Sequence, residues 1–269
     1  MAKKYKKIMA ITLVLIVVAF LVWASFLNKD NKQGMTGQVV YESSEDYSGL
    51  YKEPVSFTGY HYCNFVFDYE LEDYAKEQEW IFKKFCNLSE NYPVIKDFLY
   101  DEYFVDVESS DEWQFSAWYY GGGNIIINNK FKRAKNLDIY IAHEIAHSST
   151  ENLNLPTWLD EGIAQYSGYR FFGTQTKLTR FWFQGIEKWN PNTASVGENI
   201  KGYTHSGYII RYFVEEYGDN FISDLLKELY GKINYEDDID TKNQKVLSAF
   251  RKVTNNENLS LDDILRKYP

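Results

Sequence analysis

Two histidines four residues apart constrain this chain more than any other feature of its sequence. His143 and His147 lie in the stretch IAHEIAHSST, with Glu144 directly after the first histidine. Residues i and i+4 lie on one face of an α-helix. If the stretch is helical, the two imidazoles therefore point in the same direction, and Glu144 is rotated away from them by one residue.

The neighbours of this motif are apolar at Ile139–Ala142 and Ile145–Ala146, which predicts a helix in the protein interior. Two histidines and a glutamate are costly to bury unless something compensates them. A zinc ion does so, because imidazole nitrogens bind Zn²⁺ at about 2.0–2.1 Å. Glu144 is then placed to act as a general base on a water at the ion rather than as a ligand. The alternative is an ordinary helix that matches the pattern by chance.

A catalytic zinc site needs a third protein ligand and an open position. Glu161 lies fourteen residues after His147, in NLPTWLDEGIAQYSGY. Thr157 and Asp160 predict a capping box that opens a second helix, and Trp158 offers an apolar anchor for packing this helix on the first. The alternative for Glu161 is a solvent-facing glutamate near a helix start.

These residues together resemble a known family. HEIAH followed by LPTWLDEGIAQY is similar to the gluzincin zinc metallopeptidases, specifically the peptidase-MA-like group related to aminopeptidase N and leukotriene-A4 hydrolase. The resemblance covers about residues 57–218. It implies an α+β zincin-type domain in which one zinc ion is held by His143, His147 and Glu161, with Glu144 as the general base.

Two further segments resemble the family. YTHSGYIIRYFVEEYG is similar to the helix whose leading tyrosine donates a hydrogen bond to the developing oxyanion, which points to Tyr203. His205 is the alternative donor, and a role for neither residue is the third possibility. GGGNIIINN resembles an edge strand that pairs with an extended substrate. The implied partner is a peptide or protein bound near Asn124–Asn128.

The departures from the family pattern also carry information. Aminopeptidases of the group hold the free amine of the substrate with a glutamate, but the matching stretch Gly121–Asn124 has no acidic residue. An endopeptidase is therefore favoured over an aminopeptidase. Thermolysin-like gluzincins orient a zinc-bound histidine with an aspartate, and the residue at that position here is Gln165, whose amide oxygen carries no charge.

An uncharged, apolar-dominated run from Ile8 to Leu27 predicts a membrane segment. Twenty helical residues span about 30 Å, the thickness of the hydrocarbon core of a bilayer. Residues 1–7 contain four lysines, which predicts a cytoplasmic flank and a cell-membrane protein with its catalytic domain outside. The alternative is a cleaved signal peptide and a secreted protein.

The residues after Leu27 carry a net charge of −13, from 25 basic and 38 acidic side chains. This excess of negative charge argues against a nucleic-acid partner. Cys63 and Cys86 are the only cysteines. Outside the cytoplasm they could form one disulfide, and the sequence leaves their pairing open.

The order of the expected elements favours an α+β fold. Polar residues 28–55 predict a linker, followed by one peptidase-like domain at 56–269. Strands are expected within 60–69, 103–109 and 121–129, and a helix over 71–91. Helices follow from the motif onward and fill 219–269, where Ser260 and Asp263 predict the capping box of the last helix. Strands first and helices later indicate α+β architecture.

The leading hypothesis is a membrane-anchored, extracytoplasmic zinc metallopeptidase of the gluzincin type. One alternative is a catalytically silent binding or sensing module on the same fold. Another is a zinc hydrolase that acts on a cell-wall substrate.

Overall fold

The computed structural model describes residues 55–57, 64–67, 71–91, 102–108, 116–132, 134, 136–172 and 183–266. The apolar run at 8–27, its flank at 1–7, the linker up to residue 54 and Cys63 lie outside these ranges. The anchor and the linker therefore stay predictions, and the pairing of the cysteines stays open. Within the described ranges, no helix is long and apolar enough to cross a membrane.

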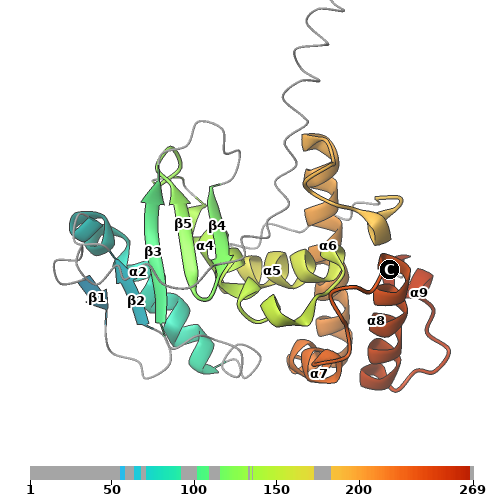
Figure 1. The fold of residues 1–269 in the computed structure, drawn as a ribbon. Helices are drawn as coiled ribbons and strands as arrows, with labels where there is room; N and C mark the ends of the chain where they lie inside the picture. The colour runs from blue at the N-terminus through green and yellow to red at the C-terminus, as the bar shows by residue number, and fades with distance from the viewer. Residues whose placement is uncertain are drawn as a thin grey trace, which may run out of the picture. The chain divides into compact units, whose positions relative to one another are not determined.

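Within the described residues, a mixed sheet of five strands precedes the helices that carry the site (Figure 1). The strands are β1 Val55–Phe57, β2 Asn64–Phe67, β3 Glu102–Glu108, β4 Ala117–Gly121 and β5 Asn124–Asn128. Their spatial order is β1-β2-β3-β5-β4. β2, β3 and β5 run parallel, and β1 and β4 pair antiparallel at the two edges. The strands expected within 60–69, 103–109 and 121–129 are confirmed as β2, β3 and β5.

β5 is an interior strand, so the prediction of an edge at Asn124–Asn128 is wrong. It pairs with β3 on one side and with β4 on the other. The run Gly121–Gly123, with φ of 90°, 58° and 82°, turns the chain from β4 back along β5. Because glycine adopts positive φ without strain, this run makes a hairpin. The strand before the turn, which the sequence pattern did not reveal, takes the edge.

One face of the sheet is buried. Tyr103 and Val105 on β3, and Ile125 and Ile127 on β5, are at most 3% exposed, whereas Phe104 on the other face is 48% exposed. This alternation follows from the two-residue period of a strand. Helix α2, Glu72–Asn91, packs against β1 and β2, and helix α4, Leu137–His147, packs against β4 and β5.

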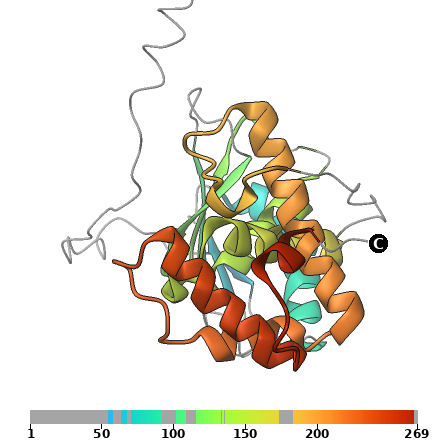
Figure 2. The ribbon, with the colours of Figure 1, turned by 90° about the vertical axis from the view of Figure 1, so that its right-hand side faces the viewer.

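The remaining helices form the larger, C-terminal part of the described fold. They are α5 Thr157–Phe172, α6 Val196–Tyr217, α7 Phe221–Leu229, α8 Ile239–Thr254 and α9 Leu261–Arg266, with short 3₁₀ helices η4 Glu151–Leu153 and η5 Ile186–Lys188. α4 packs on α5, and α5 on α6. α9 lies against α8 and reaches α6 (Figure 2). A small sheet and a mostly helical C-terminal part confirm the predicted α+β class.

One of the two predicted capping boxes forms. At the start of α9, the Asp263 amide donates to the Ser260 hydroxyl at 3.0 Å, and the Ser260 amide donates to the Asp263 carboxylate at 2.9 Å. The box predicted at Thr157 does not form, because α5 already includes Thr157 and the Asp160 carboxylate is turned toward α4. The Asp160 amide donates instead to the carbonyl of Pro156 at 3.2 Å.

Aromatic side chains fill the core between the C-terminal helices. Trp158, Phe213, Phe221 and Phe250 are each at most 2% exposed. The ring centroids of Phe213 and Phe250 lie 4.9 Å apart, and those of Phe213 and Phe221 lie 5.4 Å apart. Part of the high aromatic content is therefore core packing that holds α5, α6, α7 and α8 together.

Glycines let α4, α5 and α6 approach closely. A Cβ atom at Gly162 would lie 2.7 Å from the carbonyl oxygen of Ser206 on α6. A Cβ atom at Gly168 would lie 2.7 Å from the carbonyl oxygen of Ile139 on α4. Backbone atoms cannot yield as a flexible side chain does, so the spacing of these three helices requires glycine on α5.

Replacing Gly168 by alanine is expected to destabilise the fold by about 1–3 kcal/mol, the usual cost of overpacking. Alanine is intrinsically the better helix former by about 1 kcal/mol, so a loss of stability isolates the steric effect. Gly197 on α6 is the matched control, because a Cβ atom there meets nothing within 4 Å. Urea unfolding of Gly168→Ala and Gly197→Ala measures both changes. A Gly168→Ala chain as stable as Gly197→Ala would contradict the close approach.

Candidate metal centre

A reversal of the chain between α4 and α5 brings the three predicted ligands together. α4 ends at His147, and Asn154 then adopts a left-handed conformation with φ of 50°. Asparagine is enriched in this conformation. Trp158, 1% exposed, anchors the first turn of α5 in the core. Glu161, in the next turn, therefore lies beside His143 and His147.

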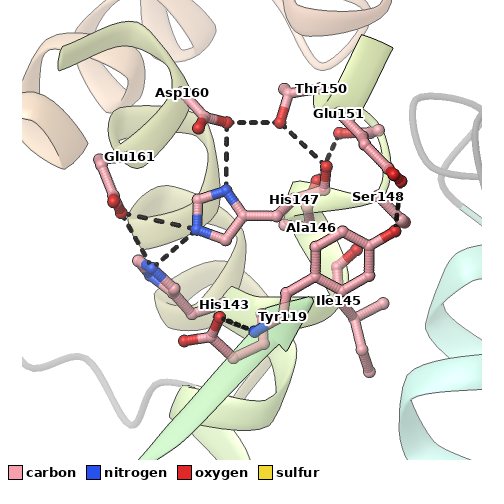
Figure 3. A network of polar contacts seen from close by, with 12 residues as sticks. Tyr119, His143, Ile145, Ala146, His147, Ser148, Thr150, Glu151, Asp160 and Glu161 are labelled. Carbon is pink, nitrogen blue, oxygen red and sulfur yellow. Dashed lines mark hydrogen bonds and ion pairs between the residues drawn. The ribbon is translucent and has the colours of Figure 1, made fainter. Parts of the chain in front are cut away.

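The three ligand atoms form a small triangle (Figure 3). Nε2 of His143 lies 3.1 Å from Oε2 of Glu161 and 3.3 Å from Nε2 of His147. Nε2 of His147 lies 3.6 Å from the same Glu161 oxygen. In a tetrahedral zinc site with bonds of about 2.0–2.1 Å, ligand atoms are separated by about 3.3 Å. The three side chains therefore fit three corners of a tetrahedron around a zinc ion.

Asp160 holds one of the two histidines in place. Its Oδ1 atom lies 3.1 Å from Nδ1 of His147 and also accepts a hydrogen bond from the Thr150 hydroxyl (Figure 3). An acceptor at Nδ1 keeps the proton there and leaves Nε2 to bind a metal. Gln165, the residue expected to orient a histidine, packs its side chain against Gly207 on α6. The sequence feature that could have identified Asp160 is its position, because it is a carboxylate directly before Glu161, the predicted third ligand.

The charged side chains of this cluster stabilise one another in their ionised forms. Burial lowers the pKa of His147, but the negative charges of Asp160 and Glu161 outweigh burial and raise the pKa well above its usual value. Burial raises the pKa of Glu161, but the charge of His147 and the hydrogen bond from His143 outweigh it and bring the pKa to about 2. Glu161 is therefore ionised at neutral pH, as a metal ligand must be.

Glu144 lies beside the triangle without joining it. Its Oε2 atom accepts a hydrogen bond from the backbone amide of Tyr119 on β4 at 2.8 Å. Burial raises the pKa of the Glu144 carboxyl, partly opposed by the charges of the two histidines and by this hydrogen bond. A raised pKa suits a group that takes up a proton and returns it near neutral pH.

These side chains line a cleft with a volume of about 480 Å³. Its size is typical of ligand and substrate sites, which occupy about 300–1,000 Å³. Four carboxylates line it, from Glu144, Glu151, Asp160 and Glu161, and none of its described lining residues is lysine or arginine. The negative lining disfavours phosphate-bearing ligands, in line with the net negative charge of the sequence.

Tyr203 on α6 also lines the cleft. Its ring centroid lies 6.0 Å from that of His143, with the rings at 68°. Burial and then the negative charges of Glu161, Glu144 and Asp160 raise the pKa of the Tyr203 hydroxyl. The hydroxyl therefore keeps its proton and can donate a hydrogen bond into the cleft.

His205 lies in the core, so its predicted alternative role as the oxyanion donor is wrong. The side chain is 1% exposed, and both ring nitrogens bind backbone groups. The Phe183 amide donates to Nδ1 at 3.1 Å, and Nε2 donates to the carbonyl of Leu265 at 3.0 Å. Two residues along a helix turn about 200°, so Tyr203 and His205 cannot both face the cleft.

His205 is expected to make the stability of the fold depend on pH. Burial lowers its pKa, and the hydrogen bonds with Leu265 and Phe183 only partly oppose this. Below about pH 6.5, the usual pKa of histidine, the unfolded chain binds a proton at this residue more readily than the folded chain does. The contribution of His205 to stability therefore decreases as the pH is lowered. His205→Gln should cost about 1–3 kcal/mol near pH 7.5, because buried backbone groups lose partners.

Thermal unfolding of both chains at pH 7.5 and 5.5 tests this. The difference in stability between wild type and His205→Gln should shrink at pH 5.5, and the comparison cancels every other titrating group. A difference that stays constant or grows on acidification would show that His205 is charged in the folded state.

Two cleft residues were not candidates from the sequence. The Tyr119 hydroxyl donates to Oε2 of Glu151 at 2.6 Å, and the Gly122 amide donates to Oε1 at 3.0 Å. Tyr119 thus joins β4 to Glu144 through its backbone and to Glu151 through its side chain. Both contacts depend on the position of β4, and no local sequence pattern marked that strand.

Comparisons with known proteins found similarity among solved structures alone. No family model and no curated protein matches it. Among solved structures it is similar to yeast leukotriene A4 hydrolase in complex with bestatin, with 14% identity, a TM-score of 0.47, and coverage of 81% of this chain and 40% of that chain. It is also similar to native leukotriene A4 hydrolase from Saccharomyces cerevisiae, with 14% identity, a TM-score of 0.46 and coverage of 80% and 39%. The chain thus spans about two fifths of the length of these proteins.

Proposed function

We propose that this chain is a zinc-dependent hydrolase of the gluzincin type that cleaves peptide bonds. The observation that carries the proposal is the triangle of His143, His147 and Glu161, with sides of 3.1, 3.3 and 3.6 Å, beside Glu144 in a cleft. A zinc ion bound there would polarise the scissile carbonyl and make a water molecule more acidic.

The chain's own residues supply the proton transfers. Glu144 takes a proton from the water that attacks the scissile carbonyl carbon, and gives this proton to the amine nitrogen as the C–N bond breaks. The water oxygen becomes part of the new carboxyl group, and no other reactant is needed. Tyr203 donates its O–H to the carbonyl oxygen that gains negative charge.

A peptide substrate would pair with β4. The Asn128 amide on β5 donates to the carbonyl of Ser116 at 3.0 Å, so these two residues form a hydrogen-bonded pair. Hydrogen-bonded and non-hydrogen-bonded pairs alternate along antiparallel strands. The backbone groups of Ala117 and the carbonyl of Tyr119 therefore point away from β5, where an extended peptide can reach them, whereas the Tyr119 amide donates to Glu144.

Cleavage within a chain is the favoured mode of action, because the sequence AWYYG of β4 contains no acidic side chain to hold a free amine. One observation favours the alternative, cleavage at a free N-terminus. Glu151, contributed by η4, brings a carboxylate to the end of β4 and lines the cleft. Matched peptides with free and acetylated N-termini separate the two modes.

The location of the protein is part of the proposal. Residues 8–27 would anchor the chain in the cell membrane, with the catalytic domain outside the cytoplasm. The apolar run and its lysine-rich flank support this topology. Protease added to intact cells should degrade the catalytic domain, and protection from protease would contradict the orientation.

The test of the proposed function uses the full-length chain in a mild non-ionic detergent. Metal analysis should find near-stoichiometric zinc, and a proteome-derived peptide library should be cleaved until a chelator removes the metal. Adding zinc back should restore cleavage. Zinc without any cleavage would favour a binding module, and hydrolysis of cell-wall cross-links alone would favour the other alternative. Absence of a bound divalent metal would refute the site.

A further inference from the structure

The wall of the cleft around Tyr203 comes from one stretch of chain. Pro191, Asn192 and Tyr203 all line the cleft. The first two follow η5, and Tyr203 lies early in α6. A capping box fixes the start of α6, because the Ser195 amide donates to the Glu198 carboxylate at 2.8 Å and the Glu198 amide donates to the Ser195 hydroxyl at 3.3 Å. The start of α6, from which Tyr203 extends into this wall, is therefore held in a defined position.

Trp189 packs behind this wall. Its side chain is 6% exposed, and its ring centroid lies 5.0 Å from that of Tyr203 with the rings at 84°. The indole N–H donates to Oδ1 of Asn199 at 3.2 Å, and Nδ2 of Asn199 donates to the carbonyl of Pro191 at 2.9 Å. Asn199 thus ties both the indole and the cleft-lining Pro191 to the same turn of α6.

Gly202 makes room for the indole. A Cβ atom at Gly202 would lie 2.2 Å from Cε2 and 2.5 Å from Cδ2 and Cζ2 of Trp189. Non-bonded carbon atoms in contact lie about 3.5–4.0 Å apart. Any other residue at position 202 would therefore displace Trp189, so Gly202 and Trp189 fit only together.

Packing fixes the direction of the Tyr203 side chain. Its ring lies between Trp189 and His143, with centroid distances of 5.0 and 6.0 Å. Among the described residues, none makes a hydrogen bond with the Tyr203 hydroxyl. Within the described fold, the orientation of the Tyr203 side chain therefore depends on these two ring contacts. No hydrogen bond from a described residue would hold the side chain if one of them were lost.

We propose that Trp189, seated on Gly202 and held by Asn199, is a positioning residue that directs the Tyr203 hydroxyl into the cleft. The proposal rests on the proposed function for its catalytic consequence, since Tyr203 acts there on the developing oxyanion. The position of the Tyr203 ring does not depend on that function. The ring position and the catalytic rate are therefore measured separately.

The first measurement concerns the ring itself. 3-Fluorotyrosine at position 203 alone, in the full-length zinc-loaded chain, should give one narrow ¹⁹F NMR resonance. In Trp189→Phe and in Gly202→Ala the resonance should shift and broaden, because the ring loses its packing partner. Gly197→Ala is the matched control in the same helix, since a Cβ atom there meets nothing within 4 Å, and its resonance should stay unchanged. An unchanged resonance in both test variants would overturn the proposal.

The second measurement is a double-mutant cycle on a peptide that the wild type cleaves. Tyr203→Phe should lower kcat by about 10²–10³-fold, as loss of an oxyanion donor does. Trp189→Phe should lower kcat by up to about 10²-fold, the effect of a displacement of about 1 Å, with a smaller change in KM. In the Tyr203→Phe background, Trp189→Phe should have almost no further effect, because the group that it positions is already gone.

A second buried tryptophan distinguishes positioning from general destabilisation. Trp158 is 1% exposed, and its indole N–H donates to Asn243 at 2.9 Å, as that of Trp189 does to Asn199. Trp158→Phe should lower thermal stability to a similar extent, but change kcat by the same factor in both backgrounds. If Trp189→Phe also acts equally in both backgrounds, its role is only structural and the proposal fails. If Tyr203→Phe leaves kcat unchanged while the resonance of Trp189→Phe broadens, Trp189 does position the Tyr203 ring. The proposed role of Tyr203 as oxyanion donor is then refuted.

Discussion

Glu144→Gln is expected to lower peptide cleavage by about 10²–10⁴-fold, the contribution of a general base, while the chain keeps its zinc. Glutamine is close in shape to glutamate, and its amide oxygen can still accept the hydrogen bond that the Tyr119 amide donates to Oε2 at 2.8 Å. It cannot take up the proton of the attacking water. Metal analysis and kcat on a peptide from the library measure the two effects side by side.

The matched control for Glu144 is another carboxylate of the same cleft. Glu151→Gln removes one negative charge from the lining, as Glu144→Gln does, but Glu151 contacts the Tyr119 hydroxyl and the Gly122 amide. It should retain most of the cleavage of N-acetylated peptides without charged residues, which have no free amine for Glu151 to hold. Equal losses in both variants would show that the charge of the cleft matters and that Glu144 is not the base.

Glu161→Ala is expected to weaken zinc binding by more than the 10–100-fold that loss of an outer-shell partner typically costs. The substitution removes one corner of the ligand triangle and leaves two imidazoles, whose Nε2 atoms lie 3.3 Å apart. Competition with a chelator of known affinity measures the loss. Zinc should also raise the unfolding temperature of the wild type more than that of Glu161→Ala, because at a given zinc concentration a ligand that binds more tightly stabilises the folded state more.

Asp160→Asn is the matched control for this loss. Asp160 lies next to Glu161 in the chain, and its replacement by asparagine removes the same charge. Asparagine can still accept the hydrogen bond from Nδ1 of His147, which lies 3.1 Å from Oδ1 of Asp160 in the wild type. Its affinity for zinc should lie between those of the wild type and Glu161→Ala. If Glu161→Ala binds zinc as tightly as Asp160→Asn, then Glu161 is not a ligand.

The parts of the site that the sequence predicts are those set by helix periodicity. His143, His147 and Glu144 occupy fixed angular positions on one helix, so their spacing predicts which side chains converge. The placement of Glu161 also follows from short-range features, namely a reversal of a few residues and an apolar anchor at Trp158. Helix periodicity also places Tyr203 and His205, two residues apart, on nearly opposite sides of α6, but the sequence leaves open which of them faces the cleft, and the burial of His205 decides it.

The parts that the sequence does not predict depend on segments far apart in the chain. The order of β4 and β5 is set by a hairpin, and the short aromatic strand β4 shows no alternation of its own because its residues after Ala117 are all half-buried. The contact between the Tyr119 amide and Glu144 spans 25 residues. His205 finds its partner Leu265 across 60 residues. Such pairings arise from packing of the whole fold, and no local pattern encodes them.

The glycine contacts of α5 set the smallest unit that could carry this site into another protein. A graft of IAHEIAH alone would move two of the proposed ligands and the proposed base, but neither the proposed third ligand nor the helix spacing that Gly162 and Gly168 permit. A designer who wants to transplant the site must therefore move α4, α5 and α6 as one block, together with the turn at Asn154. In engineering terms, the module is a three-helix cassette rather than a motif.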